Sequence, residues 1–239
     1  MAEVLIVLGI VGVVAALTIP TLISKYQEIV TITRLKESYS MLAQAYQFAV
    51  NENGSPDSWK FGSGMYDAVS HQKAANYLKP YLKLSADCVG KSVSYVQKYC
   101  SSAFSGAAST FFSLVRLHNG AALVFRIWYP NCDGAYANTK EHDTCGSIYV
   151  LTDPMKSSEH GKTQFAFYLT KKGVIPFGGK GSKLTFEQAC NPEIEVPYPG
   201  FSANSNMYAC TAWVIYNNNM DYLKCPGELS WDGKHSCDE

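Results

Sequence analysis

Residues 2–23 read AEVLIVLGIVGVVAALTIPTLI, and the organisation of the rest of the chain depends on this stretch. It carries one charge, Glu3, and the only polar side chains from Val4 to Ile23 are two threonines. About 20 residues at a rise of 1.5 Å each span roughly 30 Å, the thickness of the hydrocarbon core of a bilayer. We therefore expect residues 1–23 to form a helical segment that lies in lipid or in an equally apolar protein environment.

Three interpretations compete for this segment. A secretory signal peptide has a basic start, a shorter apolar core and a small-residue cleavage site. Here the first basic residue is Lys25, and the apolar run passes directly into an amphipathic pattern. A plain membrane anchor fits the length but gives Glu3 no role. A helix that lies first in the membrane and later in the core of a helical polymer accounts for every feature.

The run EVLIVLGIVGVVAALTIP, residues 3–20, resembles the N-terminal signature of type IV pilins and type II secretion pseudopilins. The resemblance implies a leader cut after a glycine by a prepilin peptidase, methylation of the new N-terminal residue, and a glutamate followed at a fixed distance by a proline. Glu3 and Pro20 have that separation. The leader and first mature residues do not precede this stretch, and Met1 stands where the family has Leu. We expect that the assigned start lacks a few residues.

Glu3 is the residue to which the resemblance assigns a role in assembly. A carboxylate at the centre of a bilayer costs about 3 kcal/mol, whereas near the end of the span it can reach the interface. The resemblance implies that its partner in the filament is the N-terminal amine of a neighbouring subunit, which sets the axial register. The alternative is an interfacial carboxylate without a partner.

Gly9, Gly12 and Pro20 weaken the helix by about 1 kcal/mol for each Gly and 3 kcal/mol for Pro relative to Ala. Small residues also let neighbouring helices approach closely in a bundle. We expect a kink or local unwinding between Gly12 and Pro20 when the segment is packed in a filament.

Residues 24–52 continue the helix with an amphipathic pattern. Apolar residues recur mostly at steps of three and four, and the opposite face is charged, which is typical of a helix that packs on a core. The apolar positions are Tyr26, Ile29, Val30, Ile32, Leu35, Tyr39, Leu42, Tyr46 and Ala49 or Val50. NENGSPDS, residues 51–58, supplies the breakers that end the helix. The whole helix would be roughly 75 Å long.

The remaining residues, 53–239, are expected to form one globular domain of the α+β class. Residues 66–84 have the pattern of a short helix limited by Pro80. Residues 111–117 and 121–129 flank His118-Asn119-Gly120, a hairpin signal. Residues 147–151 and 163–169 look like two further strands, and 173–177 could extend the sheet. We predict a long helix packed against a four-stranded antiparallel sheet.

The resemblance continues weakly beyond the first helix. The stretch from Cys145 to Phe177, with GSIYV, HGK, FAFYL and GVIP, is similar to pilin-like proteins with a long cysteine-bearing tail. CTAWVIYNNNMDYLKC, residues 210–225, resembles the tail of the same group. The aromatic residues of this tail either pack on the domain, which we favour, or bind sugar between the amides.

The charge and cysteine content limit the functional class. Twenty basic and twenty acidic residues balance to a net charge of zero, so no basic surface for nucleic acid is indicated. An even number of cysteines, all after the apolar run, points to an oxidising compartment. Their spacing suggests sequential pairs worth roughly 3 kcal/mol each, although spacing does not fix connectivity. The suggested pairs are Cys88–Cys100, Cys132–Cys145, Cys190–Cys210 and Cys225–Cys237.

Metal binding and catalysis are the alternatives for these polar residues. Zinc would need Cys132, His142 and Cys145, or Cys225, His235 and Cys237, neither of which forms a paired C-x-x-C framework. Calcium would need a cluster of oxygens, and Asp143, Asp153 and Glu159 are sparse. No nucleophile elbow, zinc-protease or phosphate-loop motif occurs. The histidines, which we expect in solvated loops, are His71, His118, His142, His160 and His235. We expect no enzyme activity, metal or cofactor.

The sequence as a whole therefore predicts a structural subunit of a type IV pilus-like filament. It would cross the bacterial inner membrane once before assembly. The pilus or secretion assembly machinery would then pack it with copies of itself in an extracellular or periplasmic filament. A pseudopilin of a type II secretion system shares this physics. A membrane-anchored extracytoplasmic binding or adhesion module is the alternative of another class.

Overall fold

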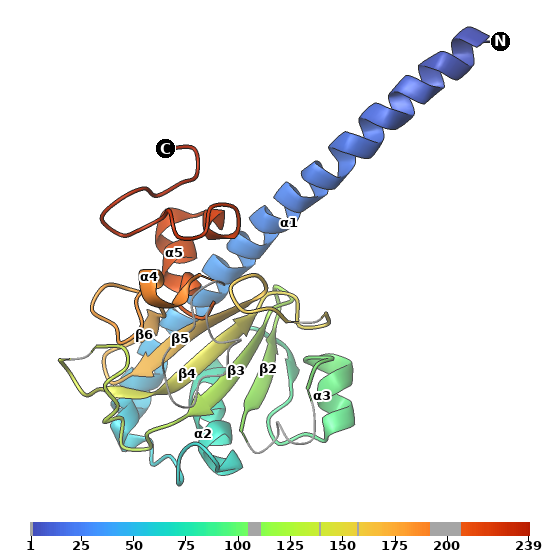
Figure 1. Cartoon of the computed structure of the whole chain (residues 1–239). Helices are drawn as coiled ribbons and strands as arrows, with labels where there is room; N and C mark the ends of the chain where they lie inside the picture. Colours follow the sequence, from blue (N-terminus) through green and yellow to red (C-terminus); the bar gives the residue numbers. More distant parts are fainter. Residues whose placement is uncertain (1, 105–110, 139, 157, 192–206) are drawn as a thin grey trace.

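The structure is a computed structural model that describes residues 2–104, 111–138, 140–156, 158–191 and 207–239, with side chains of the first helix described from Val7 onward. The first element, α1, runs from Ala2 to Asn53 and confirms the long helix. It ends where Gly54 takes a positive φ of 77° and Pro56 follows, because neither residue continues a helix readily. Figure 1 shows that the N-terminal half of α1 projects far beyond the rest of the molecule. We call this projecting half, residues 2–27, the rod.

The helix assignment of α1 is uninterrupted across Gly9, Gly12 and Pro20. The hydroxyls of Thr18 and Thr21 donate to backbone carbonyls of the same helix, at 2.9 Å to Val14 and 2.8 Å to Thr18. The single chain therefore keeps a helix through the proline. The local unwinding predicted for a filament concerns an assembly of chains and stays a prediction.

The sheet has six antiparallel strands, not the predicted four. The strands follow one another in chain order as a meander: β1 (Leu84–Asp87), β2 (Ser113–Leu117), β3 (Ala122–Ile127), β4 (Thr144–Leu151), β5 (Gln164–Thr170) and β6 (Val174–Pro176). The two additional strands, β1 and β6, are short edge strands; β6 confirms that residues 173–177 extend the sheet, whereas β1 was not predicted. Each pairs with a neighbour on one side only, and the backbone of β1 is fixed by this tertiary pairing rather than by a pattern of its own.

The predicted hairpin is confirmed at β2 and β3, which pair antiparallel around Asn119-Gly120. Gly120 has a φ of 88°, and the side chain of Asn119 accepts a hydrogen bond from the backbone N–H of Ala121 at 3.1 Å. The amide nitrogen of Asn119 also donates to the hydroxyl of Ser38 on α1 at 3.1 Å. The turn is thus attached to the helix that the sheet covers.

The helix predicted over residues 66–84 is shorter than expected. The α-helix α2 covers Ala68–Leu78, and a 3-10 turn, η2, covers Lys79–Tyr81. Pro80 lacks the N–H that an α-helix needs, and Leu84 already belongs to β1. Within the described ranges, the other short helices are η1 (Pro56–Ser58), α3 (Val93–Tyr99), α4 (Phe186–Ala189), α5 (Cys210–Asn217) and η5 (Asp221–Leu223).

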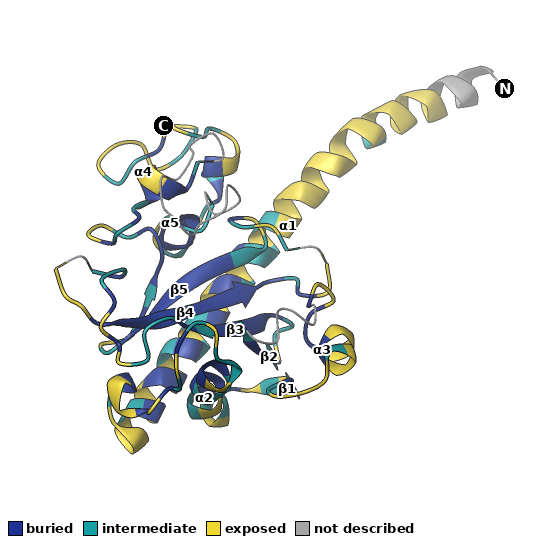
Figure 2. Cartoon of the chain, turned by 60° about the horizontal axis from the view of Figure 1, so that its bottom comes forward, coloured by how far each residue is buried: buried dark blue, intermediate teal, exposed yellow. Residues whose placement is uncertain are grey.

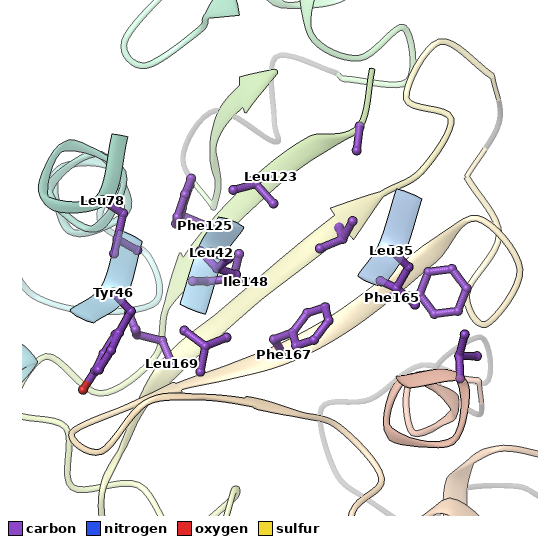
Figure 3. Packing of buried hydrophobic residues seen from close by; sticks show 14 of the residues in the cluster. Leu35, Leu42, Tyr46, Leu78, Leu123, Phe125, Ile148, Phe165, Phe167 and Leu169 are labelled. Atoms are coloured by element: carbon purple, nitrogen blue, oxygen red, sulfur yellow. The ribbon is translucent and has the colours of Figure 1, made fainter. Parts of the chain in front are cut away.

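The main core lies between the second half of α1, α2 and one face of the sheet. Leu35, Leu42 and Tyr46 of α1 are buried in this cluster, which strands β3 to β5 also line (Figure 3). The hydroxyl of Tyr46 donates to the backbone carbonyls of Thr170 and Lys171, at 3.1 and 2.8 Å. Of the predicted apolar face, Tyr26 and Ile29 are exposed, because the helix becomes buried only from Ile32 onward.

The sheet is also buried on its other face. Strand positions alternate between the faces, so Leu123 and Phe125 face the main core while Val124 belongs to a second cluster. That second cluster includes Tyr149 and Tyr168 of the neighbouring strands and Phe104 of the segment after α3. Both faces are apolar, and only one of them is covered by α1.

Candidate functional site

The exposed half of α1 is the first candidate for a functional surface. From Val7 to Gln27 every side chain is exposed except Ala15, and the relative exposure of Leu17 is 70%. Figure 2 shows this contrast along one helix, which is exposed in the projecting half and has buried residues in the half that packs on the domain. In water such a surface would associate with lipid or with other apolar surfaces, because large exposed apolar patches are rare in monomeric soluble proteins.

This half of α1 is long and apolar enough to cross a membrane, as judged by length and composition. A signal sequence near the N-terminus passes the same test. What the fold adds is continuity, since the apolar segment and the buried segment are parts of a single helix without a break.

The residues predicted to act in assembly all lie on this projecting half. Glu3 is in the first turn of the helix, and its side chain lies outside the described part. A Cβ atom added to Gly9 or Gly12 would meet no other atom within 4 Å. Nothing within the described chain therefore requires these positions to be small, so any packing reason for them must come from another molecule.

The C-terminal tail, residues 210–239, is closed by the Cys225–Cys237 disulfide and contacts α1 at the point where the helix leaves the domain. The ammonium of Lys224 lies 3.2 Å from the carboxylate of Glu28 and 2.8 Å from that of Asp221. Hydrogen bonds to Asp221, and then to Glu28, raise the pKa of Lys224 above its ordinary value. The backbone N–H of Met220 also donates to Glu28 at 3.3 Å. The tail thereby holds the base of the projecting rod.

The sequential disulfide pairs are confirmed. The bonds join Cys88 to Cys100, Cys132 to Cys145, Cys190 to Cys210, and Cys225 to Cys237. The cysteines considered as zinc ligands beside His142 and His235 are therefore not thiolates. No group of three or more residues able to hold a metal occurs in the described part of the chain. Asp153 and Glu159 instead form ion pairs with Lys156 and Lys162.

Two of the histidines do not lie in solvated loops, which corrects that expectation. His71 is on α2 and fully buried, and its Nδ1 accepts a hydrogen bond from the backbone N–H of Ile127 at 3.0 Å. His160 is on a turn before β5, and burial lowers its pKa to about 4. His118, His142 and His235 are exposed. The periodicity of residues 66–84 contained the signal for His71, since position 71 falls on the buried side of that helix.

The tail aromatics pack on the domain. Trp213 is fully buried and stacks on Phe186 with ring centroids 4.0 Å apart. The buried hydroxyl of Tyr222 donates to the carbonyl of Gly161 at 2.6 Å. Only Tyr216 of the predicted aromatic residues is largely exposed. The packing interpretation of this tail is confirmed for Trp213 and Tyr222.

A pocket on the second face of the sheet was not predicted from the sequence. It has a volume of about 280 Å³, and Arg126 of β3, His160 and Tyr208 line it together with apolar side chains. A larger hollow of about 580 Å³ lies where α1 ends. Three of the polar side chains there have partners within the chain, since Tyr81 donates to Glu52 at 2.5 Å and Lys73 donates to the carbonyl of Lys60 at 2.7 Å.

Comparison with known proteins gives a family without an assigned function. No curated protein matched the chain, and no solved structure matched it. A family model does match, and it covers residues 21–224, from just after Pro20 to just before Cys225. The residues that resemble a pilin signature precede this region, so they are independent of the match. Because the matched region spans most of the chain, the protein belongs to the family of unknown function DUF6613.

Proposed function

We propose that this chain is a structural subunit of a type IV pilus-like filament. The observation that carries the proposal is one continuous helix, α1, whose first half is apolar and exposed while one face of its second half is buried against the sheet and α2. The resemblance of residues 3–20 to the pilin signature supports the same reading. In a subunit of this form the domain core contains no residue of the rod, and the apolar side chains of the rod must be covered by lipid or by another protein.

Before assembly the rod would lie in the bacterial inner membrane, with the disulfide-bonded domain on the extracytoplasmic side. The four disulfides support this orientation, because such bonds persist in oxidising compartments. The rod needs no further folding to enter lipid, since a helix satisfies its own backbone hydrogen bonds.

Assembly would transfer the rod from lipid to a bundle of identical rods. Lipid tails are as apolar as leucine, so this transfer gains little hydrophobic free energy and depends on close packing and polar contacts. Gly9 and Gly12 have open space around them in the single chain, and that space would admit a neighbouring helix. Glu3 would form an ion pair with the N-terminal amine of the next subunit and fix the stagger.

The test replaces Glu3 by Ala in cells that make the filament. Glu3→Ala should leave the subunit in the membrane at its normal level but abolish sheared filaments seen by electron microscopy and immunoblot. Glu37→Gln is the matched control, because Glu37 is an exposed glutamate of the same helix and its carboxylate accepts a hydrogen bond from Asn119 of its own chain. This control should still assemble. Normal filaments from the Glu3→Ala chain would refute the register role.

Two other functions remain to be distinguished. A pseudopilin of a type II secretion system would show the same dependence on Glu3 but would build a periplasmic filament, so its deletion would block protein secretion. An anchored binding or adhesion module would stay monomeric in the membrane. It would tolerate Glu3→Ala without any change, and wild-type cells would shed no filaments.

A further inference from the structure

The pocket on the second face of the sheet has the features of a binding site for a small molecule. Its floor is formed by strands β2 to β4, with Leu114, Val124 and Tyr149 among its lining residues, and Phe104 and Phe112 add aromatic walls. The volume of about 280 Å³ lies just below the range of about 300–1,000 Å³ that is usual for ligand pockets. A ligand of the size of one substituted aromatic ring, or a short aliphatic chain, would fill it.

Arg126 is the only charged residue among the described side chains that line this pocket. Its guanidinium carbon lies 5.3 Å from the centre of the Phe112 ring, so the cation is held over an aromatic face. Its Nε atom is buried and has no hydrogen-bond partner among the described residues. No carboxylate of the described residues lies within ion-pair distance of it. The pocket therefore contains a positive charge and an unmet N–H donor.

His160 and Tyr208 form another part of the lining. Their ring centroids are 4.0 Å apart, and the Nδ1 atom of His160 is buried with no hydrogen-bond partner in the described part of the chain. Because burial lowers the pKa of His160 to about 4, the imidazole is neutral at neutral pH and offers one donor or acceptor but no charge. Gln164 adds an amide at the same site. The net charge of the lining at neutral pH is thus that of Arg126 alone.

We propose that this pocket binds a small amphipathic monocarboxylate, an aromatic or short aliphatic acid. Its carboxylate would pair with the guanidinium of Arg126, and its apolar part would lie against the rings of Phe112 and Tyr208. A single cation among apolar walls suits a monoanion with an apolar body. A phosphate dianion would need several cations or backbone donors, and a neutral apolar ligand would leave the buried donor unmet.

This site does not depend on the filament. It lies on the face of the sheet away from the main core, and none of its lining residues belongs to α1. A chain that never assembled would still carry it. Failure of ligand binding and failure of filament formation are therefore separate results.

The test uses the full chain in detergent micelles and isothermal titration calorimetry, with the signal from protein-free micelles subtracted. The probes are 3-phenylpropionate and its neutral amide, 3-phenylpropanamide, which differ only in the charged group. Saturable binding of the carboxylate is expected, at least about tenfold tighter than binding of the amide, as for loss of one charge-assisted hydrogen-bonded pair. Arg126→Gln should abolish this preference, whereas Arg126→Lys should keep it at reduced affinity.

Arg116→Gln is the matched control. Arg116 is on the adjacent strand β2, its guanidinium donates to the carbonyl of Tyr99 at 3.2 Å, and it does not line the pocket. Each variant is first checked for native near-ultraviolet circular dichroism. Any one of three results would overturn the proposal: no saturable binding of 3-phenylpropionate by the wild-type chain, equal affinity for acid and amide, or an unchanged preference in a folded Arg126→Gln chain.

Discussion

One substitution made at two positions on the same helix tests the division of α1 into a buried and a projecting half. Leu42 is fully buried between α1 and the sheet, whereas Leu17 has a relative exposure of 70%. Leu42→Ala and Leu17→Ala remove the same atoms from the same kind of helix. Their effects on the domain should differ because only Leu42 belongs to the buried core of the domain.

The expected size follows from these burials. Removing a fully buried leucine side chain costs about 3–5 kcal/mol, because a cavity remains where the side chain was. For a domain of this size, each 1 kcal/mol lowers the melting temperature by about 2–4 °C, so Leu42→Ala should lower it by about 6–20 °C. Leu17→Ala should change the free energy of unfolding by less than about 0.5 kcal/mol, since exposed substitutions rarely do more.

The assay is thermal unfolding of the oxidised full chain in detergent micelles, followed by near-ultraviolet circular dichroism, together with filament yield from cells. Leu42→Ala should reduce stability and thus the amount of subunit. Leu17→Ala should leave subunit level and melting temperature unchanged and reduce filament yield, because a packing contact between rods is lost. If Leu17→Ala lowered the melting temperature as much as Leu42→Ala, the rod would be buried within its own monomer and the reasoning would be wrong.

Three further results are expected from the same unfolding assay. The unfolded chain takes up a proton on His160 at an ordinary pKa of 6.5, whereas the folded chain does so only at about 4. Stability should therefore fall as pH drops from about 6.5 towards 5, by at most about 1.4 kcal/mol per unit, and His160→Gln should flatten this slope. Tyr46→Phe should cost about 1–3 kcal/mol, because the hydroxyl that donates to the carbonyls of Thr170 and Lys171 is lost from a buried or part-buried site; no change in melting temperature would contradict it. Replacing Cys225 and Cys237 together by Ser opens a bond with a sequence separation of 12 and should cost about 3 kcal/mol. Amide hydrogen exchange of the same variant, measured separately, should increase first in residues 219–239. An equal increase in exchange across the whole domain would count against a separately anchored tail.

Much of the fold follows from local patterns in the sequence. The apolar run, the change to helical spacing after Lys25 and the breakers at 54–56 determine where α1 starts to be amphipathic and where it ends. The hairpin follows from Asn119-Gly120, because a glycine accepts the positive φ that the turn needs. The sequential cysteine pairs join residues 12 to 20 positions apart, a spacing that short loops can close.

Other features depend on tertiary structure. Strand β1 exists because β2 offers its free edge, and its four residues have no alternating pattern long enough to be recognised. Residues 173–177 indicate a possible extension of the sheet, and their pairing with β5 as β6 is decided by tertiary structure. His71 is buried because α2 lies against β3, whose Ile127 N–H donates to its ring.

The pocket is the clearest case of a feature decided by tertiary structure. Arg126, His160 and Tyr208 come from a strand, a turn and the tail, separated by 34 and 48 positions in the chain, and each taken alone has no distinctive sequence context. Contacts between residues that are close in sequence can be predicted from residue spacing and from the residues that form turns. Contacts between distant residues are set by how the strands pair and which face each one presents, so the rod could be predicted from sequence and the pocket could not.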